Sequence, residues 1–240
     1  MTAADLCVAG LDGCRAGWVL ATARVSPDRR GVARLRSVGV TVVPTFAEAV
    51  ALVLDGTIAA MGVDMPIGLP EQGQRSADRA ARRRLGPRRS SVFPTPVRAA
   101  LHSADYPDAL ARSRAVDGRG LPKQAYNLLP RMAEVDEAMT PELQSRVFEC
   151  HPETVFTRLG DGPLTTTKHT REGLDVRGDL LRPWFLEDIG AVPAPRGAKA
   201  DDVLDALAVA VTAWRFTIGD VEHLGDGERD GRGLRMEIVV

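Results

Sequence analysis

The sequence predicts an α/β protein built on a mixed five-stranded sheet, three antiparallel strands followed by parallel strands, flanked by helices. Three observations support this fold class. Residues 8–43 hold three strand patterns separated by short turns that contain Gly or Pro. A short helical pattern then leads into a continuous apolar run, which is typical of a buried parallel strand. Near the C-terminus, a helix rich in Ala, Val and Leu must pack on nearly all of its sides.

Length and composition predict a single domain with a sizeable core. The chain has 240 residues, 44% of them hydrophobic, and we expect one domain over residues 1–240 with a mostly helical insertion at about 71–140. The net charge of −1 argues against a basic nucleic-acid coat or an acidic tail, so charge must be inspected locally.

The cysteines and the N-terminus predict a cytoplasmic location. Cys7, Cys14 and Cys150 are odd in number and lack CxxC spacing, which argues against a disulfide framework or a structural zinc site. The first ten residues have neither a basic start nor a long apolar stretch, and no apolar run reaches the roughly 18 residues of a membrane span.

The first strand pattern ends at a carboxylate. Val8–Leu11 reads as the end of a buried strand, Asp12 closes it, and Gly13–Gly17 turns the chain into a second strand. An Asp before Gly is usually a turn former that hydrogen-bonds its own backbone. Asp12 gains interest only because other acidic residues are placed where they could meet it.

A second carboxylate follows the predicted central strand. The third strand, 32–43, leads into a short amphipathic helix at 46–54 and then into the apolar run 58–63. A helix between two strands favours a parallel crossover. Asp64 therefore lies at the end of a central strand, before a Pro- and Gly-rich stretch that continues neither element.

The next stretch is strongly basic. Residues 71–100 hold eight Arg against two acidic residues, a local charge of +6. A charged helical face is usually solvated surface. Guanidinium and hydroxyl groups in a Gly- and Pro-containing loop also suit phosphate contacts. The candidate nucleic-acid contacts are Arg75, Arg79, Arg82, Arg88, Arg89, Ser90 and, from a later loop, Lys168.

The second half of the chain adds helices and one more strand. Residues 106–139 are mostly helical, with a boundary at 121–124, and 145–150 is a short strand candidate with Glu149 near its end. Pro152 begins a helix that runs to about Leu159. A further helix is expected at about 171–189, interrupted near Pro183.

The last helix pattern, 201–216, combines an apolar body with acidic residues. Asp201 as N-cap and Asp202 as dipole partner would account for two of them. Asp205 lies one turn deeper between apolar residues and shares a helix face with Asp202. The final residues, 234–240, could add an edge strand.

These carboxylates predict a metal site. Asp12, Asp64 and Glu149 lie at strand ends that meet at one sheet edge, where α/β proteins bind ligands. Clustered carboxylates repel one another, and oxygen-rich sites select Mg²⁺ or Mn²⁺. Two such ions about 4 Å apart can activate a water molecule and stabilise the leaving oxygen in phosphodiester cleavage. The predicted catalytic residues are Asp12, Asp64, Glu149, Asp202 and Asp205, and all except Glu149 are predicted metal ligands.

Five motifs carry a family resemblance. GLDGCRAGW, GVDMPIGLP, SSVFPTP, ECHPE and DDVLDALAVA resemble the DUF429 family of predicted ribonuclease H-like nucleases over roughly residues 8–240. The last motif is also similar to the final helix of RuvC-type resolvases, whose metal-binding DxxD pair maps onto Asp202 and Asp205. The strand acids of that superfamily map onto Asp12 and Asp64. ECHPE leaves open whether Glu149 or Glu153 faces the metals.

The resemblance implies a Mg²⁺- or Mn²⁺-dependent nuclease with nucleic acid as its partner. One alternative is a non-catalytic binding module that keeps the fold. Another is an ATP-using member of the actin-like superfamily, which the size of the chain disfavours because those proteins duplicate the core. Resolvases of this fold work as dimers, but no feature of the sequence marks a dimer surface, so a homodimer remains an open alternative. The sequence does not distinguish DNA from RNA.

Overall fold

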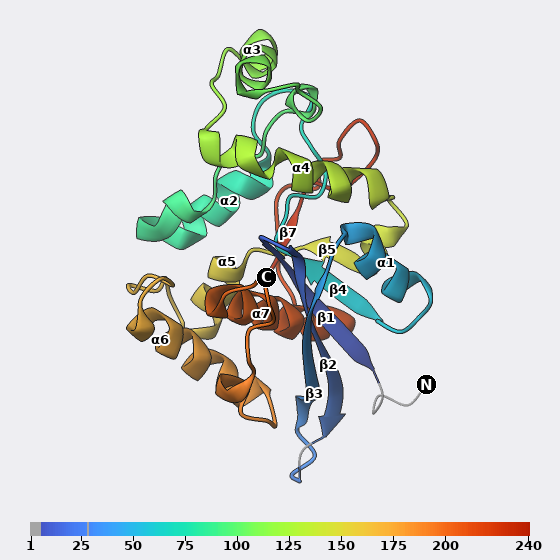
Figure 1. Cartoon of the computed structure of the whole chain (residues 1–240), viewed down its shortest axis with the longest axis vertical. Coiled ribbons are helices and arrows are strands. Elements are labelled where there is room, and N and C mark those ends of the chain that lie inside the picture. The colour runs from blue at the N-terminus through green and yellow to red at the C-terminus, as the bar shows by residue number, and fades with distance from the viewer. Residues whose placement is uncertain (1–5, 28) are drawn as a thin grey trace.

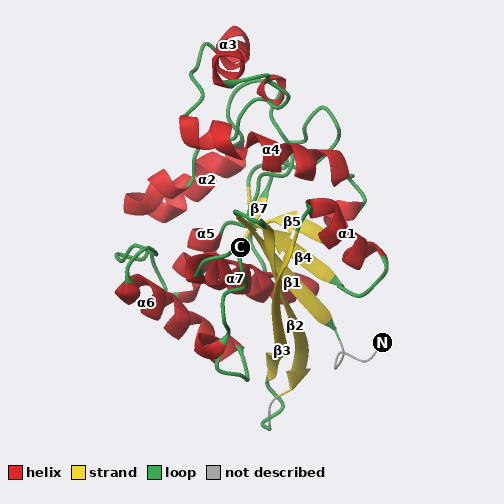
Figure 2. Ribbon diagram, in the orientation of Figure 1, coloured by secondary structure: helices red, strands yellow, loops and turns green. Residues whose placement is uncertain are grey.

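A mixed five-stranded sheet forms the centre of the molecule. The computed structural model describes residues 6–27 and 29–240. The strand order is β3-β2-β1-β4-β5, with β1–β2 and β2–β3 antiparallel and β1–β4 and β4–β5 parallel. This topology, shown in yellow in Figure 2, confirms the predicted ribonuclease H-like fold class. The strands are β1 (Cys7–Cys14), β2 (Gly17–Pro27), β3 (Ala33–Val43), β4 (Ala60–Val63) and β5 (Val147–Glu149).

Helices lie on both faces of this sheet and beyond one end of it. They are α1 (Phe46–Leu54), α2 (Ser76–Leu85), α3 (Tyr106–Asp117), α4 (Lys123–Ala138), α5 (Pro152–Leu159), α6 (Arg171–Leu181) and α7 (Ala200–Thr217). Short 3₁₀ turns lie between them, including η2 (Gly86–Ser91) and η3 (Arg98–Ala100). In the part of the chain that the structure describes, no helix is long and apolar enough to span a membrane.

Alternation along the strands separates two hydrophobic clusters. Ala9 and Leu11 of β1 face the cluster that includes α1 and α4, whereas Val8 faces the cluster that includes α5 and α7. Successive side chains of a strand point to opposite faces of the sheet, so alternate residues of each strand belong to the same cluster. The two layers can be followed in Figure 1, where α7 crosses the middle of the sheet.

Two glycines allow α7 to lie close to the sheet. Gly10 and Gly62 are register partners in the parallel pair β1–β4. A Cβ at Gly10 would lie 2.0 Å from the carbonyl oxygen of Ala206, and one at Gly62 would lie 2.6 Å from Val209. The backbone of α7 therefore occupies the space of a side chain at Gly10, and the side chain of Val209 occupies it at Gly62.

The chain makes a long excursion between β4 and β5. This stretch, which we call the 71–140 segment, contains α2, α3 and α4, drawn in green above the strands in Figure 1. α2 and α3 lie beyond the end of the sheet, whereas α4 packs against α1 in the cluster that contains Ala9 and Leu11. Whether it is an insertion into a single domain remains a prediction.

Several elements match their predicted bounds and others differ. The helices at 46–54 and 152–159 have the predicted bounds. β1 continues to Cys14, so Asp12 lies inside the strand, opposite Val19, and does not close it. α6 ends at Leu181, and a 3₁₀ turn follows at Arg182–Trp184. The predicted C-terminal edge strand is wrong: β7 (Ile238–Val239) pairs with β6 (His223–Leu224) in a separate two-stranded sheet.

Candidate active site

Strand register brings Asp12 and Asp64 together. In the parallel pair β1–β4, Gly10 lies beside Gly62, and the backbone N–H of Asp64 donates to the carbonyl of Leu11 at 2.8 Å. Asp12 and Asp64 each follow their glycine by two residues and so share its face of the sheet. That face is the one covered by α7. The two strands thus present a pair of carboxylates toward the same helix.

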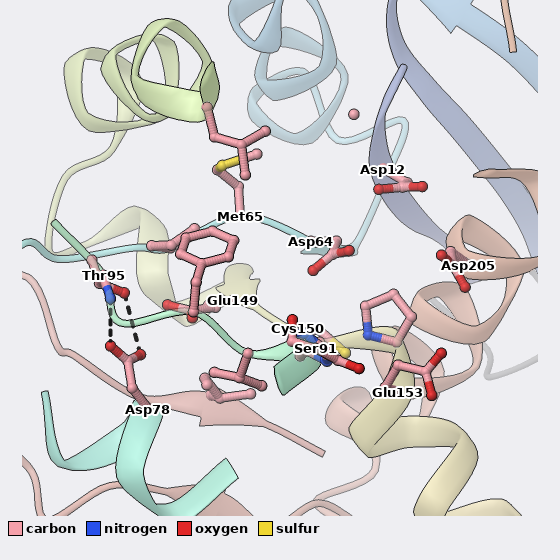
Figure 3. A pocket seen from close by; sticks show the side chains of 18 of the residues that line it. Asp12, Asp64, Met65, Asp78, Ser91, Thr95, Glu149, Cys150, Glu153 and Asp205 are labelled. Carbon is pink, nitrogen blue, oxygen red and sulfur yellow. Dashed lines mark hydrogen bonds between the residues drawn. The ribbon is translucent and has the colours of Figure 1, made fainter. Parts of the chain in front are cut away.

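α7 supplies a third carboxylate. Asp205 lies one helical turn before Val209, the residue that packs on Gly62, so its side chain points toward the end of β4. Its exposed fraction is 1%. Figure 3 shows Asp12, Asp64 and Asp205 on neighbouring elements around one hollow. Acids from three distant segments of the chain therefore converge.

The convergence raises the pKa of each carboxyl. Burial, followed by the charges of Asp64 and Asp205, raises the pKa of Asp12 well above its ordinary value. Burial raises the pKa of Asp205 to about 6, against the lowering effect of Lys168. Burial also raises the pKa of Asp64, while His151 and Lys168 oppose it. Ionising all three carboxyls together is therefore unfavourable, and a neighbouring cation would relieve their repulsion.

Lys168 supplies one cation from the chain itself. Its Nζ lies 2.5 Å from Oδ2 of Asp205, and only 31% of the side chain is exposed. Although burial lowers the pKa of the Lys168 ammonium, the charges of Asp205, Asp12 and Asp64 raise it above its ordinary value. The sequence predicted this lysine as a phosphate contact. The structure shows it as a counter-ion to the acids.

The donor set suits a hard divalent cation. All three side chains offer carboxylate oxygens, which Mg²⁺ and Mn²⁺ prefer. The other oxygen of Asp205, Oδ1, is buried without a hydrogen-bond partner among the described residues. Within residues 6–27 and 29–240, however, no three His, Cys, Asp or Glu side chains are grouped closely enough to hold one ion together. The residue types fit a metal, although three protein ligands are not grouped around one point among the described residues.

Asp202 is partly committed to the helix end. Its Oδ2 accepts the backbone N–H of Lys199 at 2.9 Å, so Lys199 occupies the N-cap position that the sequence suggested for Asp201. The charge of Asp202 also raises the pKa of Asp12. Asp202 therefore stands at the margin of the acidic cluster with one oxygen engaged in the capping box.

Glu149 was expected in the catalytic set, and the structure places it in a buried ion pair with Arg75. It pairs with Val63 across β4–β5, so its parity is opposite to that of Asp64. Its oxygens accept from Arg75 at 2.6 and 2.7 Å and from the backbone of Ile67 at 2.8 Å. These contacts engage both oxygens of Glu149 and separate it from the group formed by Asp12, Asp64 and Asp205, so a catalytic role for Glu149 stays a prediction.

Glu153 is the acidic residue of ECHPE that approaches the cluster. Its charge raises the pKa of both Asp64 and Asp205. It forms an ion pair with the fully buried Arg177 and lies 3.7 Å from Arg88. The sequence left Glu149 and Glu153 as alternatives, and it gave no signal for Arg177.

The predicted basic face divides into two sets. Arg75 is buried beside Asp78 and Glu149 and is therefore not part of an exposed basic face. Arg82 donates to backbone carbonyls of residues 89 and 92. The remaining members lie at the surface or beside the acids: Arg79, Arg89 and Ser90 are exposed, and Arg88 lines the cavity described next.

A cavity of about 330 Å³ opens beside the acidic cluster. Its walls include Asp12, Asp64, Asp205 and Lys168 on one side and apolar residues of the 71–140 segment on another. Figure 3 shows this cavity, with Met65 and Thr95 across from Asp205. Carboxylates at the edge of a cavity with mixed polarity are the usual setting of a ligand site.

Most of the chain matches one known protein family. The family model described as protein of unknown function (DUF429) matches residues 10–229. The chain belongs to this family. The matched DUF429 region includes Asp12, Asp64, Glu153, Lys168 and Asp205.

Two solved structures are similar to the chain only at low sequence identity. RuvC of Thermus thermophilus is similar to the chain at 15% identity, covering 90% of this chain and 98% of RuvC with a TM-score of 0.35. The same protein in complex with a Holliday junction substrate gives 16% identity, 90% and 97% coverage, and a TM-score of 0.37. No curated protein matches the sequence. The fold assignment therefore rests on the strand order of the sheet.

Proposed function

We propose that this protein is a Mg²⁺- or Mn²⁺-dependent nuclease that hydrolyses phosphodiester bonds of nucleic acid. One observation carries the proposal: Asp12, Asp64 and Asp205 converge from three distant segments into one buried, mutually repelling group at the edge of a cavity. Such a group is unfavourable for the fold unless cations bind it, which makes a functional role its best explanation.

The residues divide the work as follows. Asp12, Asp64 and Asp205 would hold the metal, with Asp202 at the margin. When bound, divalent ions in such sites activate water and stabilise charge on the phosphate. Lys168 neutralises part of the charge of Asp205, and because its ammonium lines the cavity, it would also be placed to contact a phosphate oxygen there. Arg88 lines the cavity, and the exposed Arg79 and Arg89 lie on the same segment, where they would contact the backbone of the substrate.

Asp64→Asn tests the proposal. The wild-type protein with Mg²⁺ or Mn²⁺ should cleave single-stranded or double-stranded DNA or RNA, and Asp64→Asn should reduce the rate by at least about a hundredfold, because the amide removes a ligand charge at nearly unchanged shape. Asp55→Asn, an exposed acid at the end of α1, is the matched control and should keep wild-type activity. Cleavage that persists in both Asp12→Asn and Asp64→Asn would refute the metal site.

A non-catalytic binding module is the second candidate. The Lys168–Asp205 ion pair favours it, because a protein that does not bind metal would still need a counter-ion for its buried acids. The two candidates differ in one measurement. The module would bind nucleic acid equally well in EDTA and in Mg²⁺ and would cleave none, whereas the nuclease requires the metal for cleavage.

A further inference from the structure

The cavity has a second side that the chemistry of phosphodiester cleavage does not use. Three apolar side chains, Met65, Phe93 and Leu128, also line it, and we call them the apolar wall. Met65 directly follows Asp64 in the chain. Met65 is 5% exposed, while Phe93 and Leu128 are half-buried. Gln124 also lines the cavity from α4. Electrostatic binding of a phosphate backbone requires none of these side chains.

The apolar wall is held rigidly in place. Phe93 lies two residues before Thr95, whose backbone N–H donates to Oδ2 of Asp78 at 2.8 Å. Asp78 accepts from Arg75, and Arg75 is paired with Glu149 at the end of β5. This buried chain of ion pairs fixes the position of the Phe93 loop relative to the sheet. It gives Arg75 and Glu149 a positioning role in place of the roles that the sequence suggested.

α4 completes the wall with a polar group. Gln124 and Leu128 are four residues apart and share a helix face. An apolar surface with an adjacent amide suits an aromatic ring that carries hydrogen-bonding groups at its edge, because the ring packs on the surface and the amide can hydrogen-bond to the edge. A nucleobase has this chemistry.

The size of the cavity limits what enters it. Small-molecule pockets range over roughly 300–1,000 Å³, and a volume of about 330 Å³ is at the low end. A paired base within a duplex cannot enter a cavity of this kind unless it leaves the stack, whereas an unpaired base enters at little energetic expense.

We propose that the apolar wall binds one unstacked base of the substrate, with the adjoining phosphate directed to the acids and Lys168. This inference rests on the proposed function and names its substrate class: a nucleotide with an unpaired base, in a single strand or free. The polar side supplies the complementary groups, since Arg88, Lys168 and His169 line the same cavity.

Binding to a matched pair of oligonucleotides tests the base site. In fluorescence anisotropy with Ca²⁺, which suits oxygen ligands, the protein should bind a labelled single strand at least about tenfold more tightly than the blunt duplex of the same sequence. Phe93→Ala should weaken single-strand binding on the order of tenfold, because a base–aromatic stack is lost. Phe93→Trp should restore it. Leu54→Ala, at an exposed position on α1, is the control and should bind as wild type.

A second pair of probes separates the base from the backbone. Replacing the central nucleotides of the strand by abasic sites keeps every phosphate, so affinity should fall to that of Phe93→Ala. If a free mononucleotide displaces the labelled strand from wild type but not from Phe93→Ala, the ligand is a free nucleotide. If it does not displace the strand, the ligand is a base within a strand. Equal affinity for single strand and duplex, or Phe93→Ala binding as tightly as wild type, overturns the inference.

The outcomes separate this inference from the nuclease proposal. Phe93-dependent binding without cleavage of any nucleic acid would keep the base site and refute the nuclease. Metal-dependent cleavage of duplex and single strand at equal rates, unchanged by Phe93→Ala, would keep the nuclease and refute the base site.

Discussion

At the scale of single residues, burial of the Asp205 carboxyl lowers the stability of the fold while placing a carboxylate in the candidate site. Its pKa of about 6 compares with an ordinary value of 3.8, a difference that corresponds to on the order of 3 kcal/mol. Between those two values the folded protein keeps a proton that the unfolded chain has lost. The free energy of unfolding contributed by this carboxyl therefore falls as pH rises through that window and is constant above it.

Asp205→Asn should remove this pH dependence. In EDTA, the variant should gain stability relative to wild type as pH rises from about 4 to about 6, by up to roughly 3 kcal/mol, and the difference should then stay constant. Urea unfolding followed at several pH values measures it. A wild-type to variant difference that does not vary with pH in this window would show that Lys168 fully compensates the burial of Asp205.

The sequence predicted the convergence of those acids that directly follow apolar strand patterns. Asp12 and Asp64 follow apolar strand runs, and their convergence needed only the assumption of parallel strands. Glu149 also follows a strand run, but its role depended on register. Because one position of offset moves a side chain to the other face, it meets Arg75 and not Asp64. Arg75 could not be separated from its exposed neighbours, since its burial is set by tertiary packing.

At the scale of elements, the contact between α7 and the sheet sets the geometry of the site. Asp205 reaches Asp64 only because Gly10 and Gly62 let the helix approach the strands. The sequence predicted α7 well, since its apolar residues surround the helix. The sequence predicted a strand within 234–240 but not the sheet it joins. A short apolar pattern does not indicate its pairing partner, and β7 pairs with β6.

Gly10→Ala tests this contact. The added methyl would lie 2.0 Å from the carbonyl oxygen of Ala206, so α7 must shift, and we expect a loss of about 1–3 kcal/mol in the free energy of unfolding. Gly13→Ala in the same strand is the matched control, because nothing lies within 4 Å of its Cβ position. Urea unfolding compares the two. Equal stabilities would show that α7 does not press on β1.

At the scale of the whole molecule, metal binding should be visible as stability. A ligand that binds only the folded state raises the free energy of unfolding by about 2.7 kcal/mol at a hundredfold excess over its Kd, which corresponds to roughly 5–10 °C in Tm for a chain of this size.

Thermal unfolding with and without Mn²⁺ should show such an increase for wild type and little or none for Asp64→Asn. The measurement also decides between the two candidate functions. A wild-type Tm that stays unchanged at millimolar Mn²⁺ would favour the non-catalytic module, in which Lys168 remains paired with Asp205.

The 71–140 segment has a consequence for how such a protein can diversify. It forms most of the wall opposite the acids as one uninterrupted stretch, while Asp12, Asp64 and Asp205 all lie outside it. Under the two proposals, the groups that select the substrate and the groups that bind the metal would be encoded in separate parts of the gene. Homologues could acquire new preferences by altering that one excursion, leaving the acidic centre and the strands beneath it unchanged.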